Sequence, residues 1–100
     1  MVWPWHSNEA TSFIWSDSTV KGFDYVPADA TIRLTIVDYC ETEVTFLFGE
    51  VADVYKTELV YVTKSRHRHK SGKYTIVLYD DDGPILSFHY RRVKRRGPLT

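Results

Sequence analysis

A run of basic and histidine residues in the second half of the chain holds the densest group of side chains that could do chemistry. It reads Arg66-His67-Arg68-His69-Lys70. In an extended segment, alternation would place Arg66, Arg68 and Lys70 on one side and both histidines on the other. Guanidinium groups hold phosphates and carboxylates through paired hydrogen bonds. The basic side therefore predicts binding of an anion or a partner.

The two histidines of this run raise the alternative of a metal site. His67 and His69 form a His-x-His pair, which needs one or two further ligands from elsewhere in the chain. Spacing along the chain does not bring His6, Cys40 or His89 beside them. A polar loop without a specific ligand accounts for the same residues, so we expect no metal site and no cofactor.

A second basic segment lies near the C-terminal end of the sequence, between residues 91 and 96. Clustered cations bind nucleic acids by releasing the counterions condensed on phosphates. A basic segment can also keep a sheet edge from pairing with neighbouring molecules. Taking both segments together, the candidate residues for binding an anion or a partner are Arg66, Arg68, Lys70, Arg91, Arg92, Arg95 and Arg96.

Signatures of catalysis are weak. The acidic segment 80–82 before Gly83 lacks the alternating ligands and the distal glutamate of a calcium loop, so it predicts a turn. Cys40 has no base partner that the sequence marks, and the serines lack an elbow motif. We expect His89 on the outward face of a strand, where a solvated imidazole is commoner than a general base. The sequence predicts no catalytic residues and no enzymatic activity.

The elements that must position these residues are strands. Ile32, Leu34 and Ile36 alternate with polar residues, and Val44, Phe46 and Phe48 repeat that period of two. Strands are predicted over 18–26, 31–39, 44–48, 59–63, 73–79 and 85–93. Short turns join most of them, so we expect an all-β fold: an antiparallel meander of about six strands, forming a small barrel or sandwich, with at most one short helix.

The remaining segments are predicted to connect or end these strands. We interpret 50–57 as one helical turn or a bent connection, and 64–72 as a solvated loop tip within a long hairpin. Residues 73–79 are apolar on both faces, which predicts a central strand covered on both sides. Residues 94–100 are expected to form a mobile basic tail.

Length and composition favour a single domain over residues 1–100. Hydrophobic residues make up 43% of the chain, enough for a compact core. A single cysteine excludes an intramolecular disulfide, and we find no secretory signal and no apolar run of about 18 residues. These features predict a cytoplasmic protein that does not bind membranes.

Charge is unevenly distributed, although the formal net charge is zero. Residues 1–60 contain three basic and ten acidic residues, whereas residues 61–100 contain ten basic and three acidic ones. Acidic strands beside basic strands would neutralise this asymmetry within the molecule. The near-zero net charge also makes self-association into a homo-oligomer easier.

Three stretches, 15–25, 32–36 and 44–51, resemble small bacterial β-rich domains, some of which are immunity proteins of toxin systems. In such domains a His-Asp-small triplet opens the first strand, and the third ends in a Phe-x-x-Val pattern. Ser16 stands here where the histidine is usual. The resemblance implies a non-enzymatic domain that binds a protein partner. Nucleic-acid or anion binding through 66–70 and 91–96 is the alternative.

Overall fold

The computed structural model describes residues 9–96, which form an antiparallel β-fold with a single-turn α-helix. The expectation of an all-β fold is therefore confirmed. In chain order the elements are α1 (Glu9–Ser12), β1 (Ser18–Val26), the 3-10 turn η2 (Pro27–Asp29), β2 (Thr31–Val37), β3 (Glu43–Gly49), β4 (Ala52–Lys56), β5 (Tyr61–Val62), β6 (Lys64–Lys70), β7 (Lys73–Asp80), β8 (Gly83–Tyr90) and β9 (Arg92–Arg96).

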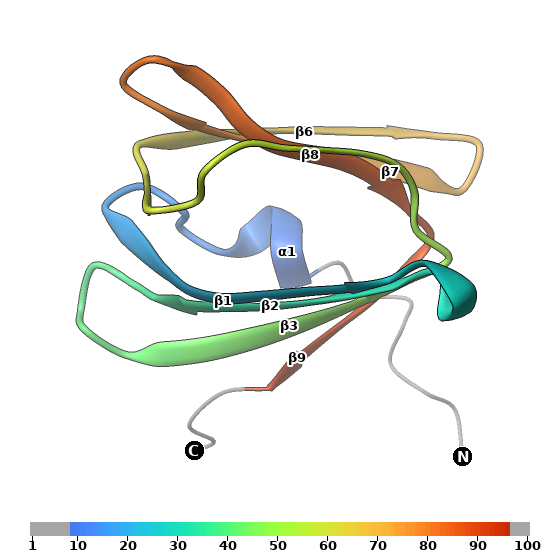
Figure 1. Ribbon diagram of the computed structural model, residues 1–100, viewed down its shortest axis with the longest axis horizontal. Helices are drawn as coiled ribbons and strands as arrows, with labels where there is room; N and C mark the ends of the chain where they lie inside the picture. Colours follow the sequence, from blue (N-terminus) through green and yellow to red (C-terminus); the bar gives the residue numbers. More distant parts are fainter. Residues whose placement is uncertain (1–8, 97–100) are drawn as a thin grey trace.

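The strands form two packed sheets. One has the order β5-β1-β2-β3-β9 and the other the order β4-β8-β7-β6. Figure 1 shows these sheets as two layers, with α1 between them. The order β5-β1-β2-β3 is that of a Greek key, in which a fourth strand returns to lie beside the first.

Three chain segments pass from one sheet into the other. The segment β3–β4 runs beside β8–β9, because β3 pairs with β9 and β4 pairs with β8. The segment β5–β6 pairs first with β1 and then with β7. Its pairing changes within one residue: the Val62 carbonyl accepts from the Asp17 N–H, and the Thr63 N–H donates to Tyr79. Six long segments therefore each have a paired neighbour on both sides, which joins the sheets into a barrel-like structure.

Alternating apolar side chains fill the space between the sheets. Ile32, Leu34 and Ile36 of β2 are fully buried beside their partners on β3. Trp15, which follows α1, lies among them with its ring 5.1 Å from that of Phe46, measured between centroids. Its indole Nε1–H donates to the Ala10 carbonyl at 2.7 Å. This bond satisfies the polar atom of a buried tryptophan and fixes α1 against the core.

The main correction to the sequence analysis concerns residues 64–72. They are not a loop tip: Lys64–Lys70 is strand β6, paired along its whole length with β7. The connection is a two-residue turn at Ser71 and Gly72, both with positive φ, as a tight hairpin with a primed turn requires. The strand was not predicted from the sequence because it contains no apolar residue. Backbone pairing can hold an edge strand in place even when the strand has no apolar face.

Other differences are smaller. The segment expected as a bent connection contains β4, which has a bulge where Asp53 takes a positive φ. Strand β7 is central, as expected, but no further layer of the described residues covers its outer face, where Thr75 and Val77 are half-buried. Residues Lys94–Arg96 pair with β3, so the basic tail does not begin at residue 94; residues 97–100 lie outside the described residues.

Within residues 9–96, no helix has the length and apolar character that crossing a membrane would require.

Replacing Trp15 with alanine should lower the free energy of unfolding by about 3–5 kcal/mol, because a large cavity would remain in the core. Tyr39→Ala is the matched control: that ring is 55% exposed, and its removal should change stability by less than about 0.5 kcal/mol. Urea denaturation followed by circular dichroism measures both. Equal losses for the two variants would contradict the placement of Trp15 in the core.

Candidate functional site

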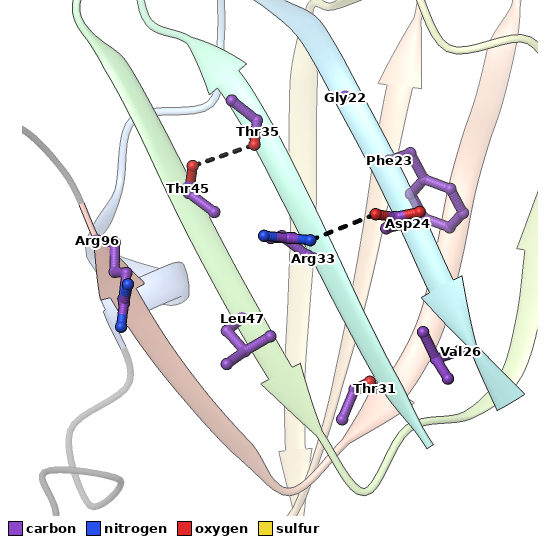
Figure 2. A pocket seen from close by; sticks show the side chains of 10 residues that line it. All are labelled: Gly22, Phe23, Asp24, Val26, Thr31, Arg33, Thr35, Thr45, Leu47 and Arg96. Atoms are coloured by element: carbon purple, nitrogen blue, oxygen red, sulfur yellow. Dashed lines mark hydrogen bonds and ion pairs between the residues drawn. The ribbon is translucent and has the colours of Figure 1, made fainter. Parts of the chain in front are cut away.

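Each sheet has an open depression on its outer face. The larger one, about 640 Å³, lies on the five-stranded sheet. Figure 2 shows the side chains that line it, contributed mainly by β1, β2 and β3. The other, about 460 Å³, lies on the four-stranded sheet where β6, β7 and β8 are adjacent. The two depressions differ in how their polar groups are satisfied.

Four polar side chains of the larger depression are paired with one another. The Arg33 guanidinium lies 3.6 Å from the Asp24 carboxylate, and the hydroxyls of Thr35 and Thr45 are 3.1 Å apart, as the dashed lines in Figure 2 mark. Close by, Lys21 pairs with Glu43. The Arg33 and Asp24 charges balance each other, so Arg96 alone gives the lining of this depression a net positive charge.

The four-stranded sheet instead carries an unbalanced group of cations on its outer face. Side chains at every second position of β6 point outward, opposite outward residues of β7. We call the following five exposed residues the basic face: Lys64, Arg66, Arg68, Lys70 and Lys73. Among the ion pairs found within residues 9–96, none involves a member of this face.

The smaller depression lies at one end of the basic face. Strand register places Arg68 on β6, Thr75 on β7 and His89 on β8 directly opposite one another across three neighbouring strands. Lys70, Ser71 and Lys73 complete its lining. A concave site therefore combines three cations, two hydroxyls and an imidazole. The side chains that converge here can donate several hydrogen bonds to one anion.

The His89 ring is fixed between two partners. Its Nδ1 lies 2.7 Å from the Thr75 Oγ1, and its Nε2 lies 3.4 Å from an Asp53 carboxylate oxygen. Asp53 reaches the ring from the bulge in β4, where its backbone has positive φ. A hydroxyl, an imidazole and a carboxylate thus follow one another, the same order as in a nucleophilic triad. The Asp53 carboxylate would also repel an anion bound in this depression.

The inner side of β6 carries the two histidines of the run. The alternation expected from the sequence is confirmed: His67 pairs with Ile76, and His69 with Tyr74, whose side chains face the core side. The His69 ring stacks on Tyr74 at 4.2 Å between centroids. The Nε2 of His67 lies 3.0 Å from the Ser65 hydroxyl, while its buried Nδ1 has no hydrogen-bond partner among the described residues.

Burial lowers the pKa of His67 below its ordinary value of 6.5, because the charged imidazolium loses solvation beneath the sheet. In the part of the chain that the structure describes, no three His, Cys, Asp or Glu side chains gather as a metal ion would require. The acidic segment 80–82, which the sequence predicts to be a turn, is a turn. In it the Asp82 N–H donates to the Asp80 carboxylate at 2.8 Å.

The basic segment 91–96 does not act as one unit. Arg91 lies beside the turn that borders the smaller depression. Its Nη1 is 3.4 Å from the position that a Cβ on Gly72 would occupy. Arg92 belongs to the opposite sheet, where its Nε is 2.8 Å from a Glu50 carboxylate oxygen. Arg95 lies over the Phe13 ring at 5.5 Å, and Arg96 lines the larger depression.

Of the seven predicted site residues, the structure therefore places three on the basic face, Arg66, Arg68 and Lys70, and places Arg91 beside the turn at its end. Lys64, Lys73 and Thr75 were not among the predicted site residues, and His89 was expected in an outward position without a role. A two-residue spacing from Arg66 could have found Lys64. No sequence signal fixes the register that brings Thr75 and His89 beside Arg68, since register depends on turn geometry and on which strands become neighbours.

Stability should fall as the pH is lowered below about 6.5, in part through His67. Because the pKa of His67 is lower in the folded chain, the unfolded chain takes up the proton first as the pH falls. The contribution of the neutral ring is thus present above 6.5 and lost on acidification. His67→Gln should show a smaller loss than the parent in urea titrations between about pH 7.5 and 5. His69→Gln, a change at an exposed ring, is the control; equal pH profiles for the parent and His67→Gln would contradict this role.

No family model, no curated protein and no solved structure matches this chain in the three comparisons made with known proteins.

Proposed function

We propose that this domain is a non-enzymatic binding module, that its ligand is a single-stranded nucleic acid, and that the basic face holds the phosphate backbone. The observation that carries the proposal is the absence of ion pairs for these five exposed cations among the described residues. Cations that lack acidic neighbours keep their full attraction for phosphates and release counterions when a strand binds.

The spacing of the cations supports an extended ligand. Lys64, Arg66 and Arg68 occupy alternate positions of one straight strand, so their Cα atoms are separated by roughly 6.6–6.8 Å at each step. This regular line suits a repeating anion better than a compact one. A globally neutral chain thereby presents a locally positive line.

An exposed aromatic side chain on the same sheet face supports a single strand over a duplex. Tyr55 of β4, 50% exposed, pairs with Ser87, whose neighbour on β7 is the outward Val77. An exposed ring can stack on an unpaired base, and such stacking tolerates any sequence.

Binding is favoured over catalysis, despite the triad-like order of Thr75, His89 and Asp53. Thr75 lies in the middle of a central strand whose backbone N–H groups are used in pairing with β6 and β8. They are not free to stabilise an oxyanion, which is the largest contribution in most triad enzymes. The imidazole, whose two nitrogens contact Thr75 and Asp53, is better explained as a group that orients the Thr75 hydroxyl beside an anion.

A second candidate is a protein partner, which the resemblance to immunity domains implies, and the basic face would suit an acidic one. The observation in its favour is that β6 is an edge strand of its sheet. Its free backbone groups could pair with an added strand, and the basic side chains would select an acidic one. Polyglutamate as a probe distinguishes this candidate: it should then bind where a single-stranded oligonucleotide does not.

A short single-stranded oligonucleotide should bind at about 50 mM salt and weaken steeply towards about 200 mM. Fluorescence anisotropy measures the affinity. For single strands, the slope of log affinity against log salt is about −0.7 per phosphate contact, so Arg66→Ala should make the slope shallower by about 0.7. Absence of binding at the lower salt concentration would exclude nucleic acid as the ligand.

Arg33→Ala is the matched control for this experiment. It removes the same charge and side chain, but from the opposite face, where Arg33 pairs with Asp24. Its affinity and salt slope should equal those of the parent. If Arg33→Ala and Arg66→Ala lose the same affinity, the attraction depends on total charge, and the basic face is not the interface.

A further inference from the structure

The end of the basic face differs from its middle. Along β6 the cations continue from Arg68 through Arg66 to Lys64. In the other direction the chain reverses at Ser71 and Gly72, so the line of cations stops at the depression. A strand that lies along the face with one end at this point would place its terminal group in the depression.

Charge at this terminus is denser than along the rest of the face. Arg68, Lys70 and Lys73 line one depression of about 460 Å³, and the Arg91 guanidinium lies against the adjoining turn. A phosphodiester carries one negative charge, whereas a phosphate monoester carries about −1.5 to −2 at neutral pH and has three strong acceptor oxygens. Several converging cations distinguish a monoester from a diester.

The Thr75 hydroxyl adds geometric selectivity in the depression, and the His89 ring orients this hydroxyl. The Thr75 hydroxyl and the His89 ring lie in the same cross-strand line as Arg68. Their mutual contact at 2.7 Å and the Asp53 carboxylate at 3.4 Å hold the ring in one orientation. Donors that are fixed before binding lose little conformational entropy when the ligand arrives. Asp53 opposes an anion, but it is 75% exposed and already engaged with His89.

From these observations, and resting on the proposed function above, we propose that the depression binds the terminal phosphate monoester of a nucleic-acid strand. The remaining backbone then follows Arg66 and Lys64 along β6. The domain should accordingly prefer strands with a phosphorylated end over the same strands with a hydroxyl end.

Three oligonucleotides of one sequence test this preference: one with a 5′-phosphate, one with a 3′-phosphate and one with hydroxyls at both ends. Competition against a labelled strand gives the relative affinities at about 50 mM salt. One of the phosphorylated strands should bind about tenfold more tightly than the hydroxyl strand, equivalent to about 1.4 kcal/mol. Equal affinities for all three would overturn the inference but leave the proposed function standing; binding of none would overturn both.

Variants locate the preference. Thr75→Val and Lys73→Gln should each reduce the tenfold ratio to about threefold or less, whereas Arg66→Gln should weaken all strands and keep the ratio. Lys73 is exposed, so its replacement tests the site even if Thr75→Val perturbs the sheet. A ratio unchanged in Lys73→Gln and Thr75→Val would place the terminal phosphate elsewhere. A phosphoserine peptide that competes as well as the phosphorylated strand would overturn the assignment to a nucleic-acid end.

Discussion

Backbone pairing on both sides of β7 determines which side chains meet on the outer face of the four-stranded sheet. The register with β6 places Arg68 opposite Thr75, and the register with β8 places His89 on the other side. A slip of one residue in either ladder would turn these side chains towards the core and bring buried ones outward. The apolar inner face of the sheet, which includes Ile76, Leu78 and Phe88, opposes such a slip. The core therefore holds the outer residues in place, although it does not touch a ligand.

The period of two in the sequence was enough to predict the class of fold and the side on which most residues lie. It succeeded for β2 and β3, where apolar and polar side chains alternate, and for the two sides of 66–70. It failed to recognise β6 as a strand, because the signal depends on apolar residues and Arg66 to Lys70 contain none. Backbone pairing with β7 stabilises β6 in place of apolar side chains. This pairing cannot be recognised from the sequence of β6 alone.

The candidate site was only partly predictable for a related reason. Charge counted along the chain suggested that residues 91–96 act together, yet the chain leaves one sheet and enters the other between Tyr90 and Arg92. Successive arginines then point to different surfaces, and Arg92 is balanced by Glu50. Apart from this pair and the contact of His89 with Asp53, the ion pairs found in residues 9–96 do not join the acidic and basic halves. The five cations of the basic face are therefore not neutralised by ion pairs with the described acidic residues.

The segments that pass between the sheets have a consequence for how the chain folds. Since β3 continues into β4 beside β8 and β9, neither sheet can be completed while the other is absent. The chain cannot be cut into two independently folding halves, and most of its stabilising contacts join residues distant in sequence. Folds of this kind assemble slowly, because long loops must close before distant strands meet. Unfolding should consequently occur in one cooperative transition that removes the outer surface and the core together.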